Sequence, residues 1–472
     1  MKKTRFFTKL FFVVLIGFAA YILFKDLGKA TLENWDEAWY AEVAKQVIKT
    51  KDFIVLRWNG EIFLEKPPMY IWLSVASSYV FGLSEFSVRL VSALSGFAII
   101  IGVLFFSFKR WGFLSSFIAF ASIVLNDVFI WRSRSGNVDT LAALLIFIAF
   151  LLMISNRKNK YILLGLLFAL IYLTKLSLVF FPFMILILYE AIYKRKELKK
   201  NIPEYIKLLI ISVALSGAWI FLGFTRIGTE FIRYYIFNSD QGVVNINLLN
   251  FKRDYWDYAY NSLQRRYYFI FLVGIAFLTK GIKDSKNFLI LLFSLSLLIF
   301  LSFTQRNNNW YLVPSMPFWS LAIGYGTYKL LKVFHDSKFM QLPLLLLIFY
   351  ISYRTFSINI LPIMNTYSTT DQAQSSRVVK ELSNQKDTII RLDHLYPAAI
   401  YYSDRNFLAS PKESNTNKYF ISRVDVTKGI KSKKFIWLMG TKEEVKEFIK
   451  QNIDLKLREI DVNKSEAIIQ VI

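Results

Sequence analysis

The amino-acid sequence predicts a polytopic α-helical membrane protein that ends in a small α/β domain. Hydrophobic residues make up 55% of its 472 residues and charged residues only 19%, against about 25% charged in a typical soluble domain. The hydrophobic residues gather in long blocks such as 141–154 and 342–350, and a polar stretch, 363–472, follows the last block. This pattern excludes an ordinary soluble enzyme, a disordered chain and a coiled coil.

A membrane-spanning helix needs roughly 20 apolar residues, and this criterion predicts about eleven spans. The fifth and sixth are separated only by Leu176–Leu178. The predicted spans are 7–25, 86–108, 112–131, 137–155, 161–178, 179–193, 206–225, 267–280, 287–303, 311–331 and 342–361.

Basic residues cluster on alternate loops between these spans, for example at 194–200 and 280–286. Because short basic loops stay in the cytoplasm, we expect the N-terminus inside, the C-terminus outside and a location in the inner (cytoplasmic) membrane. These loops also account for the net charge of +24, so no nucleic-acid partner is implied. The absence of cysteine excludes disulfides and thiolate chemistry.

Two domains are expected. Residues 1–362 form the transmembrane domain, with a first outer loop at 26–85 that carries interfacial helices and a further large outer loop at 226–266. Residues 363–472 form an extracytoplasmic α/β domain, because helix-like and strand-like segments alternate there.

The first outer loop contains an amphipathic helix predicted over Glu33–Thr50. Asn34 and Glu37 have the spacing of a capping box, which puts Asp36 in the first turn, where the helix dipole favours the ionised form. Asp36 and Glu37 point about 100° apart, whereas Tyr40 shares a face with Asp36. An interfacial helix with solvated acids fits the same spacing.

The sequence Glu65-Lys66-Pro67-Pro68 predicts a rigid elbow, because two prolines end any preceding helix and are tolerated at the start of the next. Lys66 is then held close to the membrane, where it either meets a lipid phosphate or extends to the interface. Asp139 opens a predicted span, where the dipole favours an acid. Lys175 lies near the outer end of another span.

Aromatic residues gather at 231–237 and 255–260, and a polar run at 306–309 precedes Trp310 and Tyr311. Interfacial aromatics are typical of a membrane belt; a platform for a sugar or a gate over a cavity is the alternative. The 306–311 segment is either a polar cap or a contact for an acceptor.

Several motifs occur in an ordered set within the first 90 residues. They are Asp36-Glu37-Ala38-Trp39-Tyr40-Ala41-Glu42, Asn59-Gly60, Glu65-Lys66-Pro67-Pro68, Phe81-Gly82 and Arg89. In these motifs the sequence resembles the polyprenyl-phosphate-dependent membrane glycosyltransferases of the GT-C class. Within that class it is similar to the branch with the protein O-mannosyltransferases and the lipid A aminoarabinose transferase. Beyond these residues the resemblance is one of span count, topology and an outer C-terminal domain.

The resemblance implies inverting transfer of a sugar from a polyprenyl (undecaprenyl) phosphate to a lipid, glycan or protein acceptor on the outer face of the membrane. It implies that Asp36 is the base or orients the acceptor, that Lys66 binds the donor phosphate, and that Asp139 acts in the same cavity. Some relatives have an arginine at the position of Trp39, so other cations are expected to compensate. The further phosphate-binding candidates are Arg89, Lys175, Arg265 and Arg266, and the candidates for the substrate cavity are Glu37, Tyr40, Glu65 and Tyr311.

A fixed cation suits this chemistry because charge develops on the leaving phosphate, and a carboxylate suits the loss of a proton from a hydroxyl acceptor. A divalent cofactor held by Asp36, Glu65 and Asp139 stays open. The alternative function is a polytopic transporter or lipid flippase, which requires charged or broken helices at the bilayer midplane. Convergence of Asp36, Lys66 and Asp139 at one cavity distinguishes the two.

Overall fold

The computed structural model describes residues 2–238, 251–263, 266–305, 307–333, 346, 349–350, 352–366, 369–412 and 418–472. The chain divides into two compact units. The first consists of Met1–Leu27, Leu64–Leu73 and Arg89–Thr366, and the second of Gly28–Phe63, Ser74–Val88 and Tyr367–Ile472. In this division most of the first outer loop groups with the C-terminal segment, residues 367–472. The transmembrane domain 1–362 and the extracytoplasmic domain 363–472 stay a prediction.

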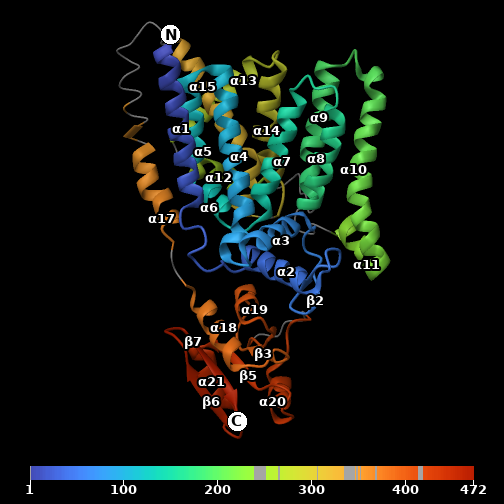
Figure 1. Cartoon of the computed structure of the whole chain (residues 1–472), viewed down its shortest axis with the longest axis vertical. Helices are drawn as coiled ribbons and strands as arrows, with labels where there is room; N and C mark the ends of the chain where they lie inside the picture. Colours follow the sequence, from blue (N-terminus) through green and yellow to red (C-terminus); the bar gives the residue numbers. More distant parts are fainter. Residues whose placement is uncertain are drawn as a thin grey trace. The chain divides into compact units, whose positions relative to one another are not determined.

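The first unit is a bundle of helices (Figure 1). Its helices include α1 (Lys2–Phe24), most of α4 (Glu85–Trp111), α5 (Phe113–Val124), α6 (Asp127–Arg134), α7 (Val138–Met153), α8 (Lys160–Thr174), α9 (Phe180–Tyr193), α10 (Leu198–Ile227), α11 (Thr229–Ile232), α12 (Asp254–Ser262), α13 (Arg266–Lys280), α14 (Ser285–Leu301), α15 (Met316–Val333) and α17 (Leu361–Met364). The helix α3 (Met69–Phe81) begins in the first unit, and its larger part, from Ser74 on, belongs to the second. Shorter 3₁₀ and π segments are η1 (Leu176–Val179), η2 (Arg233–Asn238), η3 (Asn309–Ser315) and η4 (Phe356–Ile360). The helices α13 and α15 pack closely because small residues lie at their contact. A Cβ added to Gly274 of α13 would lie only 2.1 Å from the Ala322 carbonyl oxygen of α15.

Three helical segments among the described residues are long and apolar enough to cross a membrane: α4, Leu176–Tyr193 and α10. The shorter apolar helices include α7, α8 and α14. These helices fit a membrane protein, and the number of eleven spans stays a prediction. The predicted span 342–361 lies largely outside the described residues.

One predicted span is broken. The segment 112–131 was expected to be a single helix, but α5 and α6 are bent by 63°. The side chain of Asn126 accepts a hydrogen bond from the Phe129 amide at 2.9 Å and so caps a new helix. Asparagine competes with the helical backbone in this way. The predicted division between spans five and six is confirmed, because α8 ends at Thr174 and η1 precedes α9.

The second unit contains α2 (Asp36–Thr50) and a hairpin of β1 (Arg57–Trp58) and β2 (Glu61–Ile62). Asn59 and Gly60 join these strands with φ of 53° and 80°, as the favoured two-residue hairpin turn requires. A five-stranded sheet follows in the order β4-β3-β5-β7-β6. Its strands are β3 (Thr388–Arg391), β4 (Asn406–Ala409), β5 (Trp437–Thr441), β6 (Leu457–Asp461) and β7 (Glu466–Val471).

In this sheet β3 pairs in parallel with β4 and β5, whereas β7 pairs antiparallel with β5 and β6. The accompanying helices are α18 (Asp371–Leu382), α19 (Pro397–Ser403), α20 (Arg423–Lys431) and α21 (Lys442–Gln451). The amphipathic α21 buries Val445 and Phe448 against Leu438 and Ile469 of the sheet. The segment is thus built from alternating helices and strands around one apolar core.

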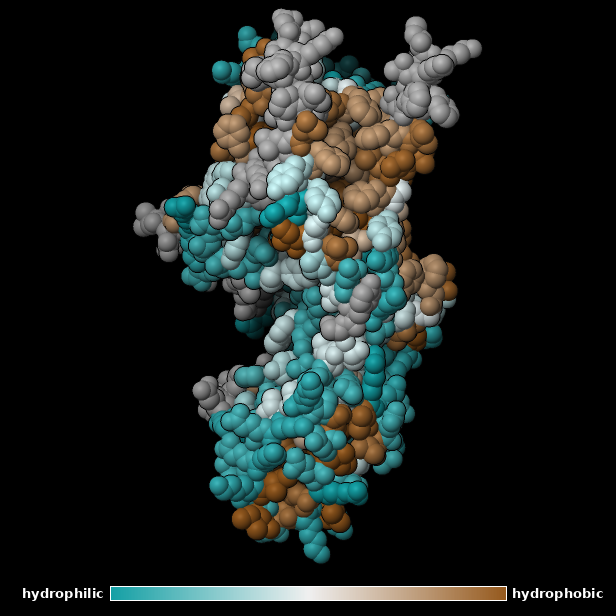
Figure 2. Space-filling view, turned by 90° about the vertical axis from the view of Figure 1, so that its left-hand side faces the viewer, coloured by the Kyte–Doolittle hydropathy of each residue, from teal (hydrophilic) through white to brown (hydrophobic). Residues whose placement is uncertain are grey.

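The surfaces of the two units differ in composition. Figure 2 shows hydrophobic side chains gathered over the helices of the first unit and mostly hydrophilic side chains over the C-terminal segment. Exposed apolar residues of α10, such as Ile210, Val213 and Phe221, are more than half accessible. Such a surface is typical of helices that face lipid.

A buried ion pair holds the C-terminal sheet together, and we predict a large effect of breaking it. Arg391 and Glu466 pair with 0% and 1% of their side chains exposed. Glu466→Ala removes the more deeply buried of the two carboxylates that face Arg391, while Asp393 stays 2.7 Å from the guanidinium. The free energy of unfolding should therefore fall by about 3 kcal/mol, the low end of the cost of breaking a buried ion pair. Thermal or denaturant unfolding of the purified full chain measures this loss.

The matched control is Asp461→Ala in the neighbouring strand. Asp461 pairs with Lys442 at 2.6 Å but has 69% of its side chain exposed, so its loss should cost at most about 1 kcal/mol. Equal effects of the two variants would contradict the prediction.

Candidate functional site

A buried carboxylate lies at the start of α7. Asn137 caps this helix by accepting hydrogen bonds from the amides of Asp139 and Thr140 at 3.0 and 3.1 Å. Asp139 is 2% exposed. Its Oδ2 lies 2.7 Å from Arg132 Nη2 and its Oδ1 2.8 Å from Lys175 Nζ. Both of its oxygens therefore face cations, and the three charges sum to +1.

Two consecutive aromatic residues of η3 cover these cations. The Arg132 guanidinium lies 5.4 Å from the ring of Trp310, and also 5.2 Å from that of Trp131. The Lys175 ammonium lies 4.2 Å from the ring of Tyr311. These are cation–π distances. We call Arg132, Asp139, Lys175, Trp310 and Tyr311 the cation clamp.

Lys175 stands where the helical chain is interrupted. Its backbone is extended, with φ of −154° and ψ of 97°, between the end of α8 and the start of η1. The ammonium of Lys175 is paired with the buried carboxylate of Asp139. Arg132, the second partner of Asp139, is not among the phosphate-binding candidates predicted from the sequence. A signal was available, because an acid buried at a helix start needs a counter-charge.

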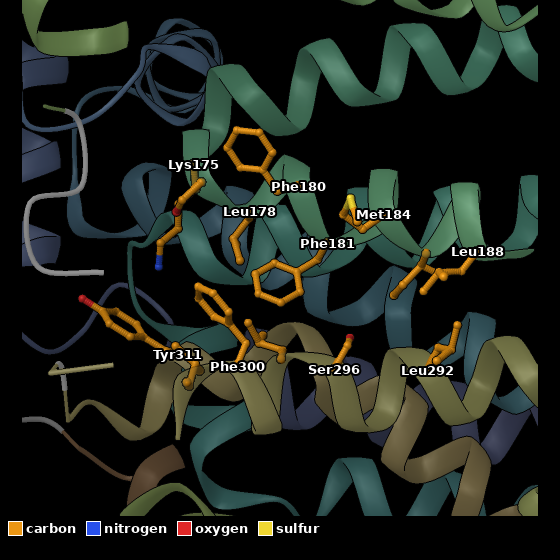
Figure 3. A pocket seen from close by; sticks show the side chains of 14 residues that line it. Lys175, Leu178, Phe180, Phe181, Met184, Leu188, Leu292, Ser296, Phe300 and Tyr311 are labelled. Atoms are coloured by element: carbon orange, nitrogen blue, oxygen red, sulfur yellow. The ribbon is translucent and has the colours of Figure 1, made fainter. Parts of the chain in front are cut away.

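An apolar pocket of about 480 Å³ opens beside the clamp. Lys175 and Tyr311 lie at one end of it and Leu188 and Leu292 at the other (Figure 3). Between these ends its walls are almost wholly apolar side chains of α9 and α14, together with Ser296. The arrangement suits a chain-like apolar molecule with an anionic head.

The elbow at 65–68 has the predicted form, since α3 begins at Met69 directly after the two prolines. Tyr235 donates a hydrogen bond to the Lys66 carbonyl at 3.1 Å, and Tyr234 donates to Glu65 Oε2 at 3.2 Å. Tyr172 of α8 lies about one turn before Lys175, and its hydroxyl donates a hydrogen bond to the Tyr235 carbonyl at 3.4 Å. Residues of η2 therefore connect the elbow to the end of α8.

Lys66 differs from Lys175 in its surroundings. Its ammonium has no hydrogen-bond or ion-pair partner within the described ranges, and its side chain is half-buried. Because no described carboxylate neutralises it, Lys66 remains a positive charge fixed by its backbone. Tyr235, which holds that backbone, belongs to the aromatic cluster noted at 231–237, although its contact with Lys66 was not predicted.

Asp36 belongs to the second unit, and α2 begins at Asp36 instead of Glu33 as expected. The cap also differs from the prediction. Glu37 accepts a hydrogen bond from the Glu33 amide at 2.8 Å, while Asn34 accepts one from the Ala398 amide at 3.2 Å. Asn34 therefore contacts another helix and does not cap its own. Glu37 is buried in this structural contact.

Two expectations for this helix are confirmed: Asp36 lies in its first turn, and Tyr40 faces Asp36, with its hydroxyl 3.5 Å from Asp36 Oδ1. Trp39, where some relatives have arginine, packs against Trp58 and Phe63 with both ring centroids 5.4 Å away.

The structure places only some of the other predicted phosphate-binding residues. Arg89 is buried and donates to the Leu27 carbonyl at 2.9 Å. Arg265 and the side chain of Arg266 lie outside the described residues. The convergence of Asp36 with Lys66 and Asp139 stays a prediction, because these residues belong to different units. In the part of the chain that the structure describes, no group of three or more acidic or histidine side chains is placed to hold a metal ion.

The chain is similar in sequence to several known proteins. Residues 65–221 match the family described as dolichyl-phosphate-mannose-protein mannosyltransferase. A protein of Aquifex aeolicus is 28% identical over 67% of this chain and 72% of its own length. The undecaprenyl phosphate-α-4-amino-4-deoxy-L-arabinose arabinosyl transferase of Aeromonas salmonicida is 26% identical over 46% of this chain, and the match spans only 40% of that protein.

The fold is similar to a solved structure. ArnT from Cupriavidus metallidurans bound to undecaprenyl phosphate superposes with a TM-score of 0.76 over 97% of both chains, at 12% identity. These comparisons confirm the predicted resemblance to GT-C polyprenyl-phosphate glycosyltransferases and indicate a glycosyltransferase.

The clamp yields a prediction about stability. Asp139→Asn keeps the shape of the side chain but leaves two buried cations without their counter-charge. The free energy of unfolding should fall by about 3–5 kcal/mol, measured by thermal unfolding of the protein in detergent.

As a control, Glu204→Gln removes the half-buried carboxylate that pairs with the exposed Lys207 at 2.7 Å, and it should change stability by less than about 1 kcal/mol. An Asp139→Asn protein as stable as the parent would mean that Asp139 is not the counter-charge that holds the clamp.

Proposed function

We propose, for a chain that resembles GT-C glycosyltransferases in sequence and in fold, that it transfers a sugar from undecaprenyl phosphate to an acceptor on the outer face of the cytoplasmic membrane. The acceptor is a lipid, a glycan or a protein. One observation carries the proposal: a clamp of net positive charge closes one end of an apolar pocket. A polyprenyl phosphate has the matching chemistry, with an apolar chain and an anionic head.

The leaving group explains the need for fixed cations. As the glycosidic bond breaks, negative charge develops on the phosphate oxygen that leaves the sugar. A cation already in place stabilises this charge most where water is scarce. Lys66 suits the role because its backbone is fixed by Tyr235 and its ammonium is not neutralised by a described carboxylate.

Lys175 and Arg132 supply a second positive region at the end of the pocket. Because Asp139 holds both at under 3 Å, we assign Asp139 the role of positioning them for the donor phosphate. This differs from general-base catalysis, for which its oxygens would need to reach a hydroxyl proton.

Asp36 is the proposed catalytic carboxylate. It lies in the first turn of α2 and is half-buried. A hydroxyl acceptor would donate its proton to Asp36 while its oxygen attacks the anomeric carbon from the side opposite the phosphate. This single displacement inverts the anomeric carbon. With an anionic acceptor, Asp36 only orients the attacking group.

The first prediction concerns Lys66. With purified protein and an undecaprenyl-phosphate sugar, Lys66→Met should lower kcat/KM about 100-fold, or about 2.7 kcal/mol, because a charge that stabilises the leaving group is lost. Lys207→Met serves as the control, since it removes an exposed lysine paired with Glu204. If the parent protein consumes no polyprenyl-linked sugar, the proposed function is wrong.

The second prediction concerns the pocket. Ser296 lies in its wall, so Ser296→Phe should fill it and raise KM for a long-chain undecaprenyl donor about tenfold, equal to about 1.4 kcal/mol. A donor with a five-carbon chain should be affected less, because its shorter chain contacts less of the pocket wall.

Val213→Phe on the exposed face of α10 controls for added aromatic volume, since Val213 is 66% exposed. If Ser296→Phe instead raises KM for the acceptor alone, the pocket holds the acceptor and its assignment to the donor is wrong.

A further inference from the structure

We propose that the C-terminal segment positions Asp36, and that Tyr402 is the principal positioning residue. The inference rests on the proposed function, because it assigns the segment a task in the same transfer reaction. All the contacts that support it lie within the second unit.

The chain that enters α2 is held by side chains and backbone of the C-terminal segment. The Leu32 amide donates to the Tyr402 hydroxyl at 2.7 Å, and the side chain of Asn34 accepts from the Ala398 amide at 3.2 Å. Thr31 accepts from the Thr370 amide at 3.1 Å. Three of the five residues before Asp36 are thus tied to a part of the chain more than 330 residues away.

Tyr402 is itself fixed from several sides. Its hydroxyl donates to Glu85 Oε1 at 2.8 Å, which leaves an oxygen lone pair directed at the Leu32 amide. Arg377 lies 3.5 Å from the same Glu85 oxygen and 4.7 Å from the Tyr402 ring. Tyr402 is 7% exposed and packs with Leu32 and Ala398 in one apolar cluster. A buried hydroxyl that both donates and accepts has one orientation.

The backbone of Trp35 connects the anchored residues 31–34 to Asp36 and transmits their restraint to it. This backbone has φ of 71° and ψ of −121°, which is strained for a residue with a side chain. Such a conformation persists only where the chain on both sides is held. The residue that follows this strained link is Asp36, so the direction in which its carboxylate leaves the chain depends on how 31–34 are held.

The other end of α2 is held by the same C-terminal segment. Lys45 donates to the Tyr401 carbonyl at 2.6 Å and lies 3.1 Å from Asp404. Asp404 also pairs with Lys49. Burial by itself raises the pKa of Asp404, but Lys49 and Lys45 hold it below its usual value. The helix is therefore anchored at both ends, and its first turn has little freedom to move.

Anchoring of this kind matters because transfer needs a carboxylate at a fixed distance from the attacking hydroxyl. A misplacement of about 1 Å can lower the rate of a positioned reaction about 100-fold. The C-terminal segment offers a frame that holds both ends of α2.

The test uses the full-length purified protein with an undecaprenyl-phosphate sugar and an acceptor that the parent protein uses. Tyr402→Phe keeps the ring but removes the hydroxyl that accepts from Leu32. We expect kcat to fall about tenfold while KM for the donor stays within about twofold, since the donor-binding cations belong to the other unit. Thermal unfolding checks that the fold is kept.

Tyr401→Phe is the matched control. Tyr401 is the neighbouring residue, and its hydroxyl has no hydrogen-bond partner among the residues that the structure describes. Its kcat should equal that of the parent. Asn34→Ala provides a second test that is independent of Tyr402, and it should lower kcat several-fold with the same unchanged KM.

An unchanged kcat in Tyr402→Phe overturns the inference, as does a loss shared equally by Tyr401→Phe. If Tyr402→Phe does not fold, the outcome for Asn34→Ala decides in the same way. The parent protein is assayed first: if it transfers no sugar, the proposed function has failed, whereas an active parent with unaffected variants contradicts only the positioning role.

Discussion

A carboxylate buried beside two cations brings the ends of several helices of the first unit together. Asp139 begins α7, Arg132 belongs to α6, and Lys175 follows α8. Burying any one of these charges alone would be costly, because a charge loses its hydration in an apolar surrounding. Together they hold three chain segments within hydrogen-bonding distance, and Trp310 and Tyr311 of η3 cover them. The end of the apolar pocket depends on this arrangement.

The same interaction separates the roles of the acidic residues. Both carboxylate oxygens of Asp139 form ion pairs, one with Arg132 and one with Lys175. Asp139 therefore serves to position these two cations. Asp36 has a different setting, in a first helical turn, half-buried and faced by Tyr40. In our proposal one carboxylate arranges the positive charge for the leaving phosphate and the other serves the acceptor. A donor phosphate and an acceptor hydroxyl require these opposite electrostatic environments.

The first outer loop is divided between the two units. Its elbow with Lys66 groups with the helical bundle, whereas α2 and the β1–β2 hairpin group with the C-terminal sheet. Asn59 of the hairpin turn exchanges two hydrogen bonds with the backbone of Phe407, at 2.9 and 2.7 Å. The loop that carries the most specific sequence motifs is thus built jointly with the C-terminal segment. This gives that segment a structural reason to be part of the enzyme.

Local patterns in the sequence were sufficient to predict the membrane class, the elbow at Pro67-Pro68, the division between α8 and α9, and the shared face of Asp36 and Tyr40. Hydrophobic blocks, prolines and helical spacing act over a few residues, so a sequence read in order reveals them. The break at Asn126 and the start of α2 were missed because a side chain's choice of hydrogen-bond partner decided both. Only the tertiary structure brought Arg132 and Lys175 to Asp139, and Tyr402 to Leu32, since these pairs depend on which buried groups find a partner across 7 to 370 residues.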